Sequence, residues 1–209
     1  MRRLWASLRV LWRHGRIHAV STGAAWGIGF FFGLFLTTQL SGAVMMAAIM
    51  ALICNAAFTL YGGAFVWTTN LQELLHFGVK RKTAMLACTM MTLGLSLALL
   101  LGTFLLSIIG AGRACWVFIP PAAWVGFIPA GMLMWMLSAL AAVVILRFGY
   151  TGLSVMYMLF MGLVLAMTEA ADMVIAAAAA YPLPLACGAL LLLFGGGSFS
   201  LWRLYKISA

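Results

Sequence analysis

Long apolar stretches make up most of this 209-residue sequence, and only 7% of its residues are charged. A soluble domain normally carries about 25% charged residues, because most of its surface faces water. This chain has too few charges to cover such a surface, so we expect hydrocarbon to surround it. The stretches do not alternate between apolar and polar residues as barrel strands do. The sequence therefore predicts an all-α fold, an integral membrane bundle of helices.

Six stretches reach the roughly 17–25 residues that a helix needs to cross a bilayer. With the N-terminus in the cytoplasm, six spans leave eleven of the twelve lysines and arginines on the cytoplasmic side. Positive residues resist translocation, so this distribution favours six spans with both termini cytoplasmic. It also accounts for the net charge of +9 without nucleic acid as a partner. The predicted spans are Ala19–Leu36, Ala43–Trp67, Ala84–Ile109, Ala122–Leu146, Thr151–Ala171 and Leu185–Trp202.

The basic residues also divide the chain into parts. It is predicted to be one transmembrane domain, 1–209, with the spans in 19–202, a cytoplasmic loop at 68–83 and a cytoplasmic tail at 203–209. Only Arg113 lies in an outside loop. The cytoplasmic basic residues are Arg2, Arg3, Arg9, Arg13, Arg16, Lys80, Arg81, Lys82, Arg147, Arg203 and Lys206.

Residues 1–18 have an amphipathic pattern. Tryptophan and leucine on one face with arginine on the other are typical of a helix lying in the membrane interface. A simple cluster of charges that directs topology is the other interpretation. The apolar face consists of Leu4, Trp5, Leu8, Leu11 and Trp12, and the basic face of Arg2, Arg9, Arg13 and Arg16.

The loop at 68–83, TTNLQELLHFGVKRKT, has the pattern of a short helix with its own start and end. Asn70 and Glu73 have the spacing of a capping box, and Gly78 stands where a left-handed C-cap is expected. Such a helix either rests on the lipid interface or docks on a partner. Its apolar face consists of Leu71, Leu74 and Leu75, and its polar face of Gln72, Glu73 and His76.

This layout resembles the membrane (permease) subunit of type-2 ABC exporters. Those subunits have an N-terminal interfacial helix, six spans and a short coupling helix between spans two and three. In many bacterial members the loop ends in a stretch like alGxtRK, where this chain has His76-Phe77-Gly78-Val79-Lys80-Arg81-Lys82. The resemblance implies that Leu71 to Phe77 form a coupling helix seated in a groove of an ATP-binding subunit. The residues it assigns to ATPase coupling are Leu71, Gln72, Glu73, Leu74, Leu75, His76, Phe77, Gly78, Lys80 and Arg81.

The ATPase itself is expected on a separate polypeptide. This chain contains no Gly-Lys pair and so lacks the phosphate-binding loop G-x-x-x-x-G-K-[ST]. ATP and Mg²⁺ therefore belong to the partner, and no cofactor is expected in this chain. The resemblance further implies a second permease copy or a related permease, an amphipathic or hydrophobic substrate, and the bacterial inner membrane. The short connection at 170–184 departs from the family, which often has a long extracellular segment there.

Two other interpretations fit the same topology. A substrate-capture subunit of an energy-coupling vitamin importer also has six spans, and it would retain its ligand without its partners. A non-transporting membrane anchor or regulator would leave substrate efflux unchanged when deleted.

Catalysis and metal binding are not predicted. His14, His18 and His76 all fall in segments expected to be cytoplasmic, away from any intramembrane serine. The sequence lacks G-x-S-x-G and H-E-x-x-H. The four cysteines, Cys54, Cys88, Cys115 and Cys187, have no metal-ligand spacing.

A few polar residues in or near the spans are candidates for a gate or a substrate path. Asn55 lies near the middle of the second span, where a buried amide usually bonds to a neighbouring helix. Glu169 and Asp172 share a face near the outer end of the fifth span, where ionisable groups are expensive unless paired or hydrated. Their other interpretation is an interfacial position, paired with Arg113.

Four glycines in the first span form two G-x-x-x-G motifs. Small residues at this spacing allow close approach of helices in lipid. The motifs predict either the face of a subunit dimer or a packing surface within the chain. The glycines are Gly23, Gly27, Gly29 and Gly33.

Overall fold

The computed structural model describes residues 2–112, 121–169 and 182–207, and these residues are almost entirely helical. No strand occurs among them, which confirms the all-α prediction for this part of the chain. The chain divides into two compact units, Met1–Ser138 and Ala139–Ala209. Four helices of the described ranges are long and apolar enough to cross a membrane, as expected of a membrane-embedded protein. They are Leu4–Thr37, Leu40–His76, Arg81–Ala111 and Gly131–Gly149.

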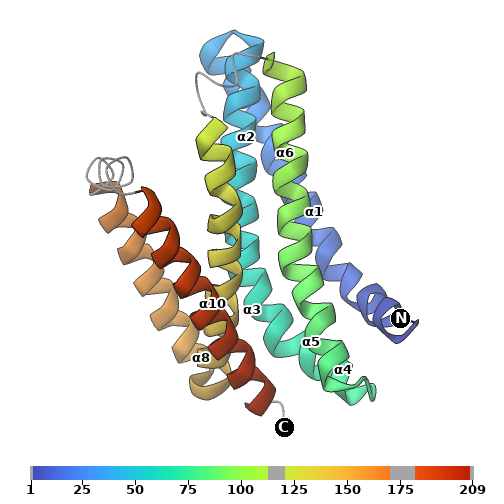
Figure 1. The fold of residues 1–209 in the computed structure, drawn as a ribbon. Coiled ribbons are helices and arrows are strands. Elements are labelled where there is room, and N and C mark those ends of the chain that lie inside the picture. The colour runs from blue at the N-terminus through green and yellow to red at the C-terminus, as the bar shows by residue number, and fades with distance from the viewer. Residues whose placement is uncertain (1, 113–120, 170–181, 208–209) are drawn as a thin grey trace. The chain divides into compact units, whose positions relative to one another are not determined.

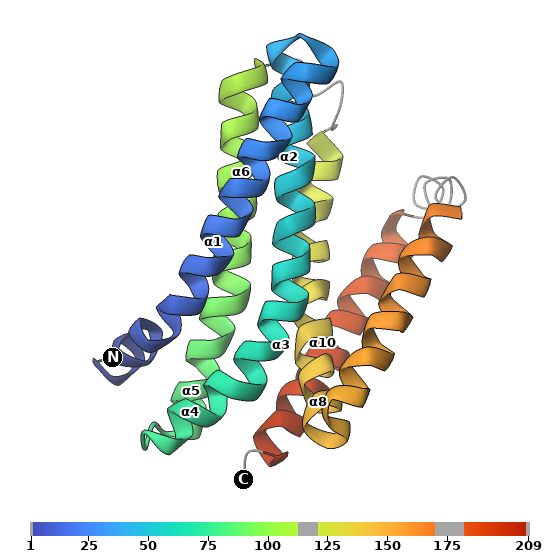
Figure 2. The same ribbon diagram turned by 180° about the vertical axis from the view of Figure 1, so that it is seen from behind.

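The first unit consists of three long helical rods and the beginning of a fourth helix (Figures 1 and 2). The first rod is α1 (Arg2–Thr37), and the fourth helix is the start of α8 (Pro121–Glu169). The other two rods contain π-helical turns, labelled η, within α-helix. The second rod comprises α2 (Leu40–Ala57), η1 (Phe58–Gly62), α3 (Gly63–Phe65), η2 (Val66–Asn70) and α4 (Leu71–His76). The third rod comprises α5 (Arg81–Thr89), η3 (Met90–Gly94) and α6 (Leu95–Ala111).

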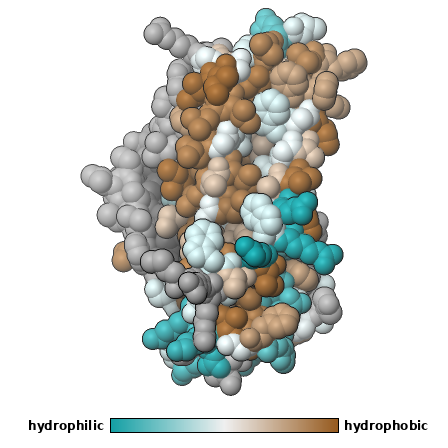
Figure 3. Space-filling view, turned by 90° about the vertical axis from the view of Figure 1, so that its right-hand side faces the viewer, coloured by the Kyte–Doolittle hydropathy of each residue, from teal (hydrophilic) through white to brown (hydrophobic). Residues whose placement is uncertain are grey.

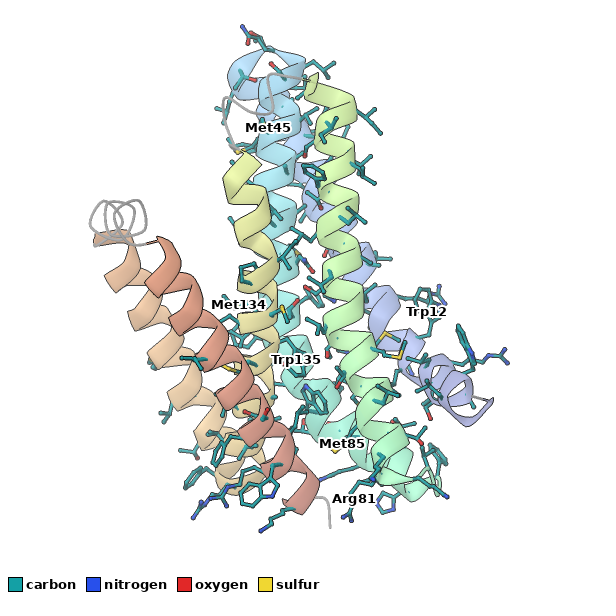
Figure 4. All side chains as sticks on the ribbon, viewed as in Figure 1. Trp12, Met45, Arg81, Met85, Met134 and Trp135 are labelled. Carbon is teal, nitrogen blue, oxygen red and sulfur yellow. The ribbon has the colours of Figure 1, made fainter. Side chains whose placement is uncertain are left out.

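The rods alternate in direction. The start of α1 and the α4–α5 connection therefore share one end of this unit, and the α1–α2 connection lies at the other (Figures 1 and 2). Arg81 and Met45 mark these two ends in Figure 4. We call the first the basic end, because it carries the exposed side chains of Arg9, Lys80 and Lys82.

Glycines hold α1 against α2. A β-carbon added to Gly33 would lie 2.6 Å from Ala43 Cα, and one added to Gly29 would lie 2.8 Å from Ala47 Cα. These distances are too short for any side chain, so the two backbones approach closely, as small residues permit in lipid. An added β-carbon would meet nothing within 4 Å at Gly23 or Gly27. Of the predicted dimer face, Gly29 and Gly33 are therefore occupied by packing within the chain.

An apolar cluster lies between α2 and α6 and consists of Val44, Met45, Ala48 and Leu100. The start of α8 contacts the second rod, since an added Gly63 β-carbon would lie 2.8 Å from Ser138 Oγ. The rings of Trp67 and Trp135 are 6.5 Å apart.

The N-terminal segment is not a separate helix. We predicted an interfacial helix over 1–18 followed by a span from Ala19, but α1 runs unbroken from Arg2 to Thr37. No breaker residue separates the two parts, and at 1.5 Å per residue the helix is ~54 Å long, well beyond the ~30 Å of a bilayer core. Its predicted apolar face is also only partly buried. Leu11 is buried, whereas Trp5 and Trp12 are 70% and 51% exposed.

The connection between α1 and α2 consists of only two residues, Thr38 and Gln39. Thr38 has φ 52°, an uncommon conformation for a β-branched residue. Thr37 Oγ1 donates a 2.7 Å hydrogen bond to the Gly33 carbonyl, which helps to close the last turn of α1.

The second unit contains the remainder of α8 and α10 (Pro182–Ile207). Gly149 has φ 64° and interrupts α8 between the predicted fourth and fifth spans. Towards its C-terminal end, α10 carries Arg203 5.3 Å from the Phe199 ring and Lys206 4.2 Å from the Trp202 ring. Such cation–π contacts suit the boundary between membrane and water.

Candidate functional site

The α4–α5 turn, residues 71–82, is the loop that the sequence singled out. The Val79 N–H donates to the Leu74 carbonyl at 3.1 Å, and the Gly78 N–H donates to the Leu75 carbonyl at 2.9 Å. Gly78 has φ 72°. This pair of bonds around a left-handed glycine is a Schellman motif, which confirms the predicted C-cap. The turn therefore has a defined backbone conformation.

The start predicted for this helix is wrong. Asn70 has helical dihedral angles, φ −71° and ψ −31°, and its side chain makes no cap hydrogen bond. An N-cap residue needs an extended backbone, so Asn70 and Glu73 form no capping box. Instead, the helix continues from Leu40 to His76. The predicted coupling helix is thus the protruding end of the second rod.

The two faces of α4 agree with the prediction. Leu71 and Leu74 are each only 1% exposed, and Leu75 is half-buried. These leucines fix α4 to the rest of the unit by burying apolar surface. Phe77 is 74% exposed. The remaining exposed side chains of the turn are Gln72, Glu73, His76, Lys80 and Lys82.

The basic residues of the turn oppose the dipole of the helix that follows. Arg81 and Lys82 lie in the first turn of α5, which has no acidic residue. Positive charge at a helix N-terminus is unfavourable by about 0.3–1 kcal/mol. These residues do not stabilise α5 through its dipole. We therefore expect them to contribute to membrane topology or to binding.

Replacing Gly78 with alanine is expected to lower the free energy of unfolding by about 1 kcal/mol, because alanine resists positive φ. Gly78→Asn should have a smaller effect, since asparagine tolerates the left-handed conformation. Unfolding of the purified protein in mixed micelles by SDS would measure both changes. Equal stability of the alanine variant and the wild type would contradict the assigned cap.

A second group of residues forms a buried polar cluster inside the first unit: His18, Asn55, Thr59 and Ser96, from three rods. His18 Nε2 lies 2.8 Å from Asn55 Oδ1. Asn55 Nδ2 donates to the Ser96 carbonyl at 3.0 Å. Thr59 Oγ1 lies 2.7 Å from Ser96 Oγ. The cluster thereby connects α1, the second rod and α6 by hydrogen bonds, which stabilise contacts between helices in lipid.

The sequence only partly anticipated this cluster. The predicted bond from Asn55 to a neighbouring helix is confirmed twice, to His18 and to Ser96. His18 itself, however, is 4% exposed and lies within the helix packing. Its ring also stacks on Phe58, with centroids 5.2 Å apart. Residue spacing in the sequence could not reveal the contact between His18 and Asn55, because the two residues are 37 positions apart.

A pocket of about 260 Å³ adjoins the polar cluster. Its polar lining is Asn55, Thr59 and Ser96, and the π-helical turn η1 contains Thr59. Such turns often occur at functional sites, because the widened helix exposes backbone groups. An apolar pocket with a few polar groups suits an amphipathic molecule. Its apolar lining is Leu52, Ile53, Ala56, Leu97, Leu100, Gly131 and Met134.

The structure does not describe the side chains of the other predicted gate residues. Arg113 and Asp172 lie outside the described residues. Glu169 is the last residue of α8, and only its backbone is described. Within the described ranges, no group of three or more histidine, cysteine, aspartate or glutamate side chains has the arrangement of a metal site.

Comparison with known proteins finds no matching family model, no matching curated protein and no matching solved structure.

Proposed function

We propose that this chain is the membrane subunit of an ATP-driven exporter of the ABC type. It crosses the bacterial inner membrane six times, with both termini in the cytoplasm, and works with a second permease copy or a related permease. A separate ABC ATPase, carrying ATP and Mg²⁺, docks on the α4–α5 turn.

Support for the docking role comes from the construction of this turn. Buried Leu71 and Leu74 anchor α4, and the Schellman motif at Gly78 fixes the chain reversal. Directly after this anchored helix, the Phe77 side chain is 74% exposed. Aromatic side chains of this kind are frequent anchors of protein interfaces. A helix that only rested on lipid would direct its apolar leucines outward, whereas here Leu71 and Leu74 are buried in the protein.

The second rod connects this turn mechanically to the pocket. The same rod carries α4 at the basic end and Asn55 further inside the unit. A displacement of the turn by the ATPase would therefore move Asn55 against His18 and Ser96, which belong to other rods. The partly apolar pocket beside them suits a hydrophobic or amphipathic substrate. Arg113, Glu169 and Asp172 remain predicted gate residues.

The test is to replace Phe77 with serine and to measure the ATPase that remains bound. The tagged chain would be purified in mild detergent, and co-purifying proteins with a phosphate-binding loop would be quantified by mass spectrometry. Loss of an interface anchor weakens binding by more than 1 kcal/mol, so we expect about tenfold less ATPase.

Phe148→Ser is the matched control, because Phe148 is also an exposed phenylalanine, 61% accessible, beside the Gly149 interruption. ATPase recovery should be unchanged in this control. If no such ATPase accompanies the wild type even after crosslinking in membranes, the exporter proposal fails. Equal loss in both variants would show that Phe77 is not the docking anchor.

A further inference from the structure

A large groove lies along the first part of α1, away from the polar cluster. Its volume is about 870 Å³, within the usual range of small-molecule sites. The α1 wall includes Trp5, Leu8, Arg9 and Trp12, and Arg9 is the one charged residue among the lining residues that the structure describes. The facing wall consists of Met90, Met91 and Leu95, from η3 and the start of α6.

The groove lies beside the contact between α1 and the third rod. At Gly15 the two are in close contact, since an added β-carbon would lie 2.8 Å from Met91 Sδ. Trp12 lies on the part of α1 that precedes Gly15 (Figure 4). Large side chains remain uncovered there: Trp5 is 70%, Trp12 51% and Met90 47% exposed.

The groove has a polar side and an apolar side. Arg9 lies six residues before Gly15, ~9 Å nearer the basic end along the helix axis. The methionines and Leu95 form the deeper, apolar part. Among the residues coloured in Figure 3, hydrophilic ones gather mainly in the lower part of the view and hydrophobic ones predominate above them. A ligand suited to the groove has an anionic group at Arg9 and an apolar chain towards the methionines.

We propose that this groove is a binding site for one anionic phospholipid, with its phosphate at Arg9 and an acyl chain against Met90, Met91 and Leu95. Tryptophan and arginine are the side chains that favour the level of lipid headgroups. Exposed Arg13, one turn further along α1, adds positive charge on the same helix. The rest of the groove lining is mostly apolar, as an acyl chain requires. This inference requires only that the chain is embedded in a membrane, so it does not depend on the exporter proposal.

The experiment measures lipid bound to the intact protein by native mass spectrometry. The protein would be equilibrated in mixed micelles with equal amounts of dioleoyl-phosphatidylglycerol and dioleoyl-phosphatidylcholine. We expect the wild type to retain phosphatidylglycerol preferentially. Arg9→Gln should weaken this retention about fivefold, as expected for one basic residue near a headgroup, and leave phosphatidylcholine unchanged.

Two further variants make the result decisive. Ala6 lines the groove, so Ala6→Trp should obstruct part of it and reduce phosphatidylglycerol retention without removing charge. Arg203→Gln removes an exposed arginine from α10 and should have no effect. Equal retention of the two lipids by the wild type would overturn the proposal in favour of ordinary surrounding lipid. Equal loss in Arg9→Gln and Arg203→Gln would overturn it in favour of non-specific charge, and a dimer that excludes lipid would assign the groove to a second copy.

Discussion

Replacing Gly33 with alanine is expected to lower the free energy of unfolding by about 2–3 kcal/mol, near the upper end of what overpacking usually costs. The new β-carbon would lie 2.6 Å from Ala43 Cα. Backbone cannot turn aside as a flexible side chain can, so α1 and α2 would have to separate. Separation would also loosen the contact of Gly29 with Ala47, one turn away. SDS unfolding in mixed micelles would measure the change.

Gly23→Ala is the matched control on the same helix. Nothing lies within 4 Å of an added β-carbon there, so alanine should gain up to about 1 kcal/mol through its helix propensity. Opposite signs at two glycines of one helix would establish that packing, not propensity, determines the loss. Destabilisation of Gly23→Ala would instead indicate that a second chain covers Gly23 and Gly27, as the dimer prediction requires.

Asn55→Leu is expected to destabilise the protein by about 2 kcal/mol. Leucine has the same number and branching of side-chain heavy atoms but makes neither the bond to His18 nor the bond to the Ser96 carbonyl. Single interhelical hydrogen bonds in membrane proteins average about 0.6 kcal/mol, and leaving the buried His18 ring without this partner adds a desolvation penalty. The same SDS titration would measure the loss.

The double variant His18→Phe/Asn55→Leu separates these contributions. Phenylalanine can keep the stacking on Phe58 and needs no hydrogen bond. Replacing both partners by apolar groups can be nearly neutral, so the double variant should recover most of the loss. Additive losses would show that His18 and Asn55 are not coupled and would contradict the observed 2.8 Å contact.

The features predicted correctly from the sequence depend on neighbours along the chain. Gly78 ends α4 because a glycine after the last helical turn adopts positive φ, and this requirement is local. The buried face of Leu71 and Leu74 follows from their spacing on one helix. Asn70 also had a local pattern, but there the helix arriving from Leu40 continued through it. Continuation keeps the backbone hydrogen bonds of the helix, and a side-chain cap cannot replace all of them.

The polar cluster was harder to predict, because its partners are distant in sequence. The hydropathy pattern placed His18 just before the first predicted span, although His18 lies only four residues before the buried Thr22. Asn55 was predicted to bond to another helix, but only the packing of α1 and α6 identifies its partners as His18 and Ser96. The surroundings of the G-x-x-x-G motifs could not be predicted from the sequence for the same reason. Gly29 and Gly23 belong to similar motifs, and only the position of α2 distinguishes their surroundings.

The two-residue connection between α1 and α2 bears on how the chain enters a bilayer during synthesis. Apart from Thr38, Gln39 and the adjoining helix ends, the backbone groups of this hairpin are paired within helices. A hairpin that inserts as one piece would thus carry very little unpaired peptide across the hydrocarbon, where each such group is expensive. If α1 entered alone, Gly29 and Gly33 would leave a cleft without Ala43 and Ala47 to fill it. Joint insertion of the hairpin is thus the favoured order of assembly, and a nascent chain arrested before Ala47 should remain extractable from the membrane.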